Sequence, residues 1–182
     1  MPVAYGFGVG DDIEIRRLLA SEYAAAGKAT VSAFREYWTP DAPGWELYLA
    51  RIADVESRAR QATVLVAVDR GVIAGSVTLE LDSRIPGSSE PLAPDEAHIR
   101  MLGVSPEHRG HGIARRLMLA CIDTARRSGK RVMTLDTEKS MTAAMQLYVD
   151  LGFQPTGSEQ RPGGPLLLGY KLDLDSESPA TR

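Results

Sequence analysis

The chain lacks several features by which whole classes of protein are identified. It has one cysteine, Cys121, so neither an internal disulfide nor a cysteine-rich metal site can form. Its three histidines, His98, His108 and His111, do not have the HExxH spacing of a zinc-binding helix. We therefore expect no metal in the site.

Long hydrophobic runs and an excess of basic residues are also missing. No apolar run reaches the roughly 18 residues of a membrane span, and the N-terminus does not join a basic region to a long apolar stretch. We therefore expect neither a membrane segment nor a secretory signal, and a cytoplasmic location. The formal net charge of −3 gives no support for nucleic-acid binding, which usually requires a basic domain.

The remaining composition is that of an ordinary globular protein. The 182 residues are 43% hydrophobic and 25% charged, which suits one domain with one core. We expect that domain to span residues 1–174. Residues 175–182 have nothing to anchor them and are expected to form a disordered tail.

Changes in hydrophobic periodicity predict a mixed chain of strands and helices. Helical spacing is found in residues 11–26 (Ile13, Leu18, Leu19 and Tyr23), 45–60, 113–129 and 141–152, and strand-like runs in 62–68, 71–81, 97–104, 131–137 and 165–174. The expected order is β α α β β β α β α β, in which the first strand is not assigned to particular residues, with room for a further strand at residues 153–157. This order predicts an α/β or α+β sheet with helices on both faces.

The stretch "SPEHRGHGIARRLM" (residues 105–118) places two glycines at the start of a predicted helix. A helix N-terminus carries N–H groups without intrahelical acceptors and attracts anions. Gly110 and Gly112 would allow close approach, and Arg109, Arg115 and Arg116 add positive charge. The stretch reads equally as a pyrophosphate cradle or as a turn with basic surface residues. It lacks the GK[ST] end of a Walker loop and the third glycine of a dinucleotide fingerprint.

The surrounding residues resemble the GNAT superfamily of acyl-CoA-dependent N-acetyltransferases. Residues 109–114, "RGHGIA", fit its central motif, and the preceding "IRMLGVSPEHRG" fits the strand that leads into it. A second motif follows in "AAMQLYVDLGF", with Ala144, Leu147, Tyr148, Gly152 and Phe153 in the matching places. One residue departs from the pattern: Met141 stands where the family often has asparagine.

The resemblance implies a fold and a site for acetyl-CoA. The fold would be a mixed, mostly antiparallel sheet of about six or seven strands, flanked by about four helices and splayed to form the acetyl-CoA cleft. The pantetheine arm would pair with the backbone of Leu102, Gly103 and Val104. The pyrophosphate would lie over the loop and first helical turn, formed by Arg109, Gly110, His111, Gly112, Ile113, Ala114 and Arg115.

The resemblance also implies direct attack of an amine on the thioester. A backbone N–H near Leu102 would stabilise charge on the carbonyl oxygen, and Tyr148 would protonate the departing thiolate. His98 stands where many relatives carry a glutamate, and it is a candidate base or a structural residue. Glu96, Glu80 and Asp136 are alternatives as base or as ligands for a cationic amine. His108 and His111 fit a solvated loop better than catalysis.

Other residues have simpler interpretations. Cys121 lies on the apolar stripe of its helix and is expected to be a buried thiol. Trp45 is expected in the core. Trp38 and Tyr48 lie in the region that shapes the acceptor pocket in the family.

The expected function is an N-acetyltransferase that moves the acetyl group of acetyl-CoA to a primary amine of a small molecule. Alternatives are a protein or peptide N-acetyltransferase, a non-catalytic acyl-CoA-binding regulator, which Met141 and the absence of a glutamate at His98 would suit, and an unrelated phosphate-binding domain. The last leaves "AAMQLYVDLGF" unexplained. Members of the family often dimerise, and the sequence leaves a homodimer open.

Overall fold

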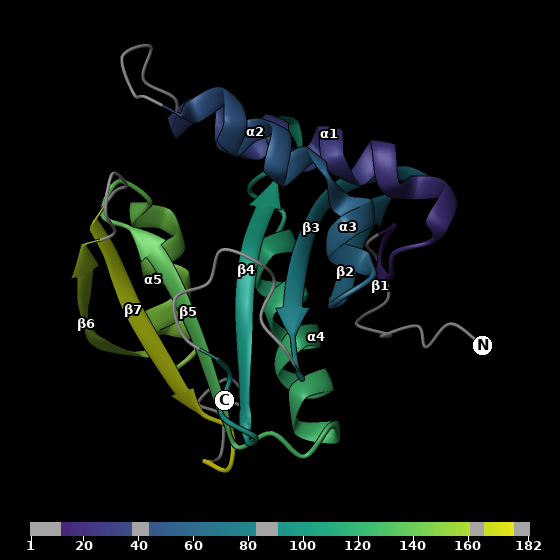
Figure 1. Cartoon of the computed structure of the whole chain (residues 1–182). Coiled ribbons are helices and arrows are strands. Elements are labelled where there is room, and N and C mark those ends of the chain that lie inside the picture. The colour runs from purple at the N-terminus through teal and green to yellow at the C-terminus, as the bar shows by residue number, and fades with distance from the viewer. Residues whose placement is uncertain (1–11, 38–43, 83–90, 161–165, 177–182) are drawn as a thin grey trace.

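A computed structural model describes residues 12–37, 44–82, 91–160 and 166–176 (Figure 1). The elements follow the chain as β1 (Ile13–Arg17), η1 (Ala20–Glu22), α1 (Tyr23–Phe34), η2 (Arg35–Tyr37), α2 (Trp45–Ala53), α3 (Val55–Ala59), β2 (Thr63–Asp69), β3 (Val72–Glu80), β4 (Glu96–Val104), η3 (Pro106–His108), α4 (Ile113–Arg127), β5 (Val132–Glu138), α5 (Thr142–Asp150), β6 (Gln154–Gln160) and β7 (Leu166–Asp173). Trp38, residues 1–11 and 83–90, and most of the expected tail lie outside the described residues.

The strands form one seven-stranded sheet in the order β1-β2-β3-β4-β5-β7-β6. Every neighbouring pair is antiparallel except β4 and β5, which run parallel. The expected mixed, mostly antiparallel sheet is therefore confirmed. The two parallel strands need a crossover connection, and α4 supplies it.

Helices cover both faces of the sheet, as the alternation of strands and helices predicted (Figure 1). Apolar side chains of α4 and α5, among them Leu117 and Tyr148, form the main core with Leu65 and Leu79 of the sheet. On the other face, Ala26 of α1 belongs to a second cluster with the valines of β2.

The prediction of a helix over residues 11–26 is wrong for its first half. Residues 13–17 form β1, in which Ile15 is fully buried and pairs with Ala67 of β2. The helix begins only at Tyr23, after Glu22 has accepted a hydrogen bond from the Leu19 N–H at 2.9 Å. The alternation of "IEIRR" is a strand signal, and pairing along β2 outweighs the looser helical spacing.

The helix expected over residues 45–60 is also interrupted. Asp54 has φ −77° and ψ 73°, which ends α2, and its side chain accepts a hydrogen bond from the Ser57 N–H at 3.0 Å. An aspartate that caps a following turn competes with helix continuation. The predicted hairpin is found between β2 and β3, where Arg70 and Gly71 have φ values of 47° and 82°, and the further strand is β6.

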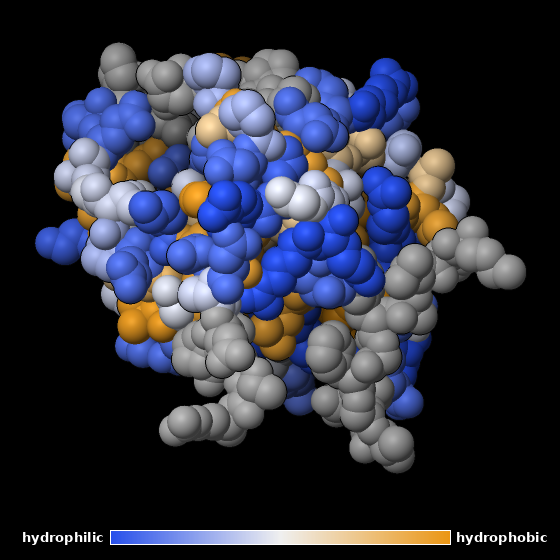
Figure 2. Space-filling model, turned by 90° about the horizontal axis from the view of Figure 1, so that it is seen from below, coloured by the Kyte–Doolittle hydropathy of each residue, from blue (hydrophilic) through white to orange (hydrophobic). Residues whose placement is uncertain are grey.

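Among the helices described, none is long and apolar enough to cross a membrane. The described residues also contain no group of three or more histidine, cysteine, aspartate or glutamate side chains placed to hold a metal ion. Hydrophilic side chains cover most of the face shown in Figure 2, with hydrophobic ones in smaller groups between them.

Helix α1 approaches the end of α2 so closely that Gly27 is required at the contact. A Cβ at Gly27 would lie 2.4 Å from the Ala53 carbonyl oxygen. Replacing a helical glycine with alanine usually stabilises a protein by about 0.5–1 kcal/mol. We predict the opposite sign for Gly27→Ala, a loss of about 1–2 kcal/mol in the free energy of unfolding.

Urea unfolding of Gly27→Ala measures this, with Lys28→Ala on the exposed side of the same helix as the control. The control should change stability by less than about 0.5 kcal/mol. A stabilised Gly27→Ala protein would show that the two helices are not in close contact.

Candidate functional site

The two parallel strands at the middle of the sheet pair over only part of their length. β4 and β5 are in register from Glu96 opposite Val132 to Ile99 opposite Leu135. Beyond Ile99, β4 continues against β3 and β5 continues against β7. The strands diverge toward the upper end of Figure 1. The β5-facing edge of residues 100–104 therefore has no strand partner among the described residues, and it can pair with an extended ligand.

A bulge lies in this unpaired part of β4. Its register against β3 shifts between Ser76 and Thr78, and Met101 has φ 53°. A residue with a side chain in this left-handed region costs about 1–3 kcal/mol, and such residues concentrate at functional sites. The bulge changes the direction of the backbone groups around Leu102, where the sequence predicts the donor to the carbonyl oxygen.

The chain leaves β4 through a glycine-containing turn that begins α4. Gly110 and Gly112 have φ values of 81° and 70°, and Gly112 is the N-cap residue of α4. A Cβ built at either glycine meets nothing within 4 Å, so the space above the turn is open. The first-turn N–H groups of α4 have no acceptors within the helix. The predicted pyrophosphate site therefore has room and donors, and Ile113, whose side chain is buried, offers only its backbone.

Arg109, which begins the predicted motif, donates its hydrogen bonds to groups of the protein. Arg109 Nη1 donates to Glu36 Oε2 at 2.7 Å, Nη2 donates to the Ala33 carbonyl at 3.2 Å and Nε donates to the Val104 carbonyl at 3.1 Å. Arg116 Nη2 donates to the Ile13 carbonyl at 2.6 Å and so joins α4 to β1. Of the three arginines expected to add charge, two therefore bind groups of the protein itself.

The two loop histidines are at the surface side of the turn. His108 Nε2 lies 3.6 Å from Asp69 Oδ2, and His111 is exposed with its Nδ1 at 3.4 Å from the His108 carbonyl. His111 therefore agrees with a solvated loop, whereas the His108 side chain is only 19% exposed.

His98 is the centre of a polar cluster on β4 and β5. It is 4% exposed, and its Nδ1 lies 2.8 Å from Thr134 Oγ1. Its Nε2 lies 3.9 Å from Asp136 Oδ2, and the Thr134 hydroxyl donates to Glu96 Oε1 at 2.5 Å. The structure therefore brings His98, Glu96 and Asp136, three of the predicted candidates, into one connected group.

Glu80 belongs to the same face. It is opposite His98 in the register of β3 and β4, and directly opposed residues project from the same side of a sheet. Glu80 is fully buried, and its Oε1 lies 3.5 Å from Arg100 Nη1. Buried charges require partners of this kind. All four predicted acid–base candidates of the sheet thus lie on the α1 side, beside the point where β4 leaves β5.

Tyr148 lies on the other side of the divergence, in α5. Its ring is 6% exposed and packs against Phe153 and Tyr170, with centroids 6.0 and 5.9 Å away. Within the described part of the chain, its hydroxyl makes no hydrogen bond. Burial, with smaller effects of Tyr37 and Tyr170, raises the pKa of Tyr148 above that of an exposed tyrosine. Tyr148 carries its proton at neutral pH, as tyrosines ordinarily do, and burial makes its hydroxyl a weaker acid than an exposed one.

An apolar cluster joins the two sides of the divergence. Phe34 of α1 is buried with Ile52 of α2, and Met101 of β4 and Met141 pack against them. Met141 precedes α5, and the Thr137 hydroxyl donates to its sulfur at 3.6 Å. Met141 thus contributes apolar packing across the divergence. Tyr48 joins the same cluster. The expectation that Trp45 lies in the core is wrong, because Trp45 is half-buried at the start of α2 with its ring 5.2 Å from that of Tyr48.

Sequence reasoning missed three residues that shape this region. Glu36 binds Arg109, Met101 forms the bulge, and Arg58 donates to the Ile52 carbonyl at 2.7 Å, which caps α2. Burial lowers the pKa of Arg58 to about 10. Glu36 and Arg109 are 73 positions apart, and no local signal links them.

Comparisons with known proteins agree with this geometry. A model of the acetyltransferase (GNAT) family matches residues 28–153. L-amino acid N-acyltransferase MnaT of Escherichia coli is 32% identical over 125 residues, which are 68% of each chain. L-methionine sulfoximine/L-methionine sulfone acetyltransferase of Salmonella typhimurium is 41% identical over 71 residues, 39% of this chain and 40% of that protein.

The fold is also found among solved structures. The structure of yncA from Salmonella typhimurium with its cofactor acetyl-CoA has a TM-score of 0.65 and 26% identity, over 92% of this chain and 96% of that one. The aligned region spans about two fifths of the length of several curated relatives.

The reactivity of the single cysteine reports whether the core between α4 and the sheet is accessible to solvent. Cys121 is fully buried in α4, and burial raises the pKa of its thiol. We predict that the native protein does not react with Ellman's reagent at pH 8 over an hour, because thiolate is the reactive form. One thiol should react after unfolding in guanidinium chloride. Rapid reaction of the native protein would contradict the packing of α4 on the sheet.

Proposed function

Because the chain belongs to the GNAT family of acetyltransferases, we propose that it transfers the acetyl group of acetyl-CoA to the primary amine of a small molecule by direct attack in a ternary complex. The observation that carries this proposal is the divergence of β4 from β5 after Ile99. It leaves an unpaired strand edge that leads directly into an open, glycine-containing helix N-terminus.

The residues present suit acetyl-CoA. The backbone of Leu102, Gly103 and Val104 offers groups for an extended pantetheine arm. The turn at Gly110 and Gly112 and the first N–H groups of α4 offer a site for a pyrophosphate. Bound there, acetyl-CoA supplies an acetyl group already activated as a thioester.

The chain's own residues would then handle the protons. His98, held by Thr134 and facing Asp136, can accept a proton from the attacking amine directly or through water. The carboxylates of Asp136 and Glu96 add negative charge that favours a cationic amine nearby. Tyr148, which like any tyrosine is protonated at neutral pH, can give its proton to the departing sulfur. The backbone N–H near Leu102 can stabilise charge on the carbonyl oxygen.

A small acceptor is supported by the relatives and by the polar face. The two bacterial relatives are named for L-amino acids and for methionine sulfoximine and sulfone. The carboxylate of Asp136, whose side chain is 32% exposed beside His98, suits an acceptor with a cationic amine. Solved ribosomal-protein acetyltransferases share less than 25% identity with this chain and therefore indicate the fold only.

The donor site is tested by Gly112→Trp. A bulky residue at φ 70° strains the turn and fills the space above it. We predict that calorimetry detects micromolar binding of acetyl-CoA and CoA to the native protein and at least about 30-fold weaker binding to the variant.

Gly71→Trp is the control, because Gly71 also has a positive φ with open space around it but lies in the β2–β3 hairpin. It should keep CoA affinity within about threefold. Equal CoA affinity in the native protein and Gly112→Trp would mean that the glycines only turn the chain.

The proton donor is tested by Tyr148→Phe, which keeps the ring contacts with Phe153 and Tyr170. Loss of a general acid lowers kcat by about 100-fold or more. We predict that loss with a CoA dissociation constant unchanged within about threefold, measured by thiol release and calorimetry. Tight CoA binding by the native protein without turnover of any amine in a broad panel would instead support a non-catalytic acyl-CoA-binding protein.

A further inference from the structure

Arg109 occupies the place where the motif predicts a pyrophosphate ligand, yet all three nitrogens of its guanidinium donate to the protein. The acceptors are the carboxylate of Glu36 at 2.7 Å and the carbonyls of Ala33 and Val104 at 3.2 and 3.1 Å. The Arg109–Glu36 hydrogen bond is charge-assisted, and the two side chains are 39% and 40% exposed. The same hydrogen bond lowers the pKa of Glu36.

These acceptors belong to separate elements that meet at the end of β4. Val104 is the last residue of β4, Ala33 lies in the last turn of α1, and Glu36 lies in η2. Arg109 itself precedes the glycine turn. Its side chain therefore joins the cofactor turn and the end of β4 to the C-terminal end of α1.

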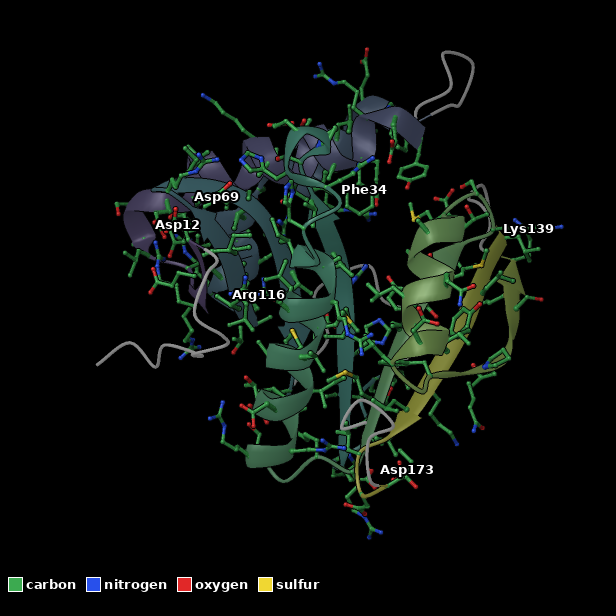
Figure 3. The ribbon with its side chains drawn as sticks, turned by 180° about the vertical axis from the view of Figure 1, so that it is seen from behind. Asp12, Phe34, Asp69, Arg116, Lys139 and Asp173 are labelled. Atoms are coloured by element: carbon green, nitrogen blue, oxygen red, sulfur yellow. The ribbon has the colours of Figure 1, made fainter. Side chains whose placement is uncertain are left out.

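The C-terminal end of α1 packs closely against β4 at Gly103. A Cβ built at Gly103 would lie 2.9 Å from the Ala33 Cβ and 3.3 Å from the Phe34 ring. Figure 3 shows Phe34 where the end of α1 meets the upper end of β4. Tyr37 interacts with the Glu36 carboxylate and is near enough to Tyr148 to influence its pKa.

We propose that Arg109 is a positioning residue, whose guanidinium fixes Phe34 and Tyr37 beside the acyl end of the cofactor site and does not bind the pyrophosphate. Glu36 is its partner in this role. The proposal rests on the proposed function for where the acyl group lies. In this proposal, the hydrogen bonds of Arg109 hold the C-terminal end of α1 against the glycine turn before α4. Loss of the charge of Arg109 or of Glu36 would loosen Phe34 and Tyr37, while the N–H groups at the start of α4 stay in place.

The first test needs no turnover. Arg109→Gln and Glu36→Gln should each speed amide hydrogen exchange of residues 29–37 by at least about fivefold in the free protein, measured by mass spectrometry. Calorimetry should show CoA affinity within about threefold of the native value. Arg60→Gln, which removes an exposed Arg60–Glu56 pair in the same way, is the matched control and should change neither quantity. Unchanged exchange, or a tenfold loss of CoA affinity in Arg109→Gln alone, would overturn the proposal.

The second test uses a donor without a pyrophosphate. With acetyl-CoA, Arg109→Gln should lower kcat/KM for the amine by about tenfold, and Arg109→Lys should recover part of the loss because it keeps one contact to Glu36. With S-acetylpantetheine as the donor, the ratio of kcat/KM between the native protein and Arg109→Gln should be the same as with acetyl-CoA. If the two proteins had equal kcat/KM with S-acetylpantetheine, Arg109 would be shown to act on the pyrophosphate. If the native protein turns over no amine, the proposed function fails, and exchange and calorimetry still decide the role of Arg109.

Discussion

The hydrogen bonding between β4 and β5 ends at Ile99, and the arrangement of the candidate site follows from that limit. Beyond this point β4 still pairs with β3, and β5 still pairs with β7. The sheet therefore opens at its centre while each of the two strands keeps one hydrogen-bonded neighbour. Each strand is also followed by its own helix. The glycine turn of α4 therefore lies at the end of one arm, and Tyr148 in α5 lies on the other.

An opening in the middle of a sheet requires contacts that hold its two arms at a fixed separation. At the base, Thr134 of β5 is hydrogen-bonded to both His98 and Glu96 of β4. At the upper end, Phe34 packs with Met101 and Met141, which come from opposite arms. Polar contacts at the base and apolar packing at the upper end therefore connect the two arms.

Local sequence signals predicted the parts of this site that depend on neighbouring residues. The glycine turn, the helix after it and the β2–β3 hairpin follow from short-range backbone preferences, and the structure has all three. The strand at residues 13–17 was missed because a five-residue alternation is weaker than the helical spacing around it, and only pairing with β2 decides between them. The Arg109–Glu36 pair and the bulge at Met101 depend on tertiary contacts, which no single sequence displays.

Amide hydrogen exchange of the native protein, with and without acetyl-CoA, tests the central account most directly. We expect acetyl-CoA to protect two segments, residues 102–104 at the free edge of β4 and residues 110–115 at the start of α4, because these backbone groups would pair with the ligand. Protection confined to other parts of the sheet, or no protection at saturating acetyl-CoA, would contradict the assignment of the opening between β4 and β5 as the cofactor site.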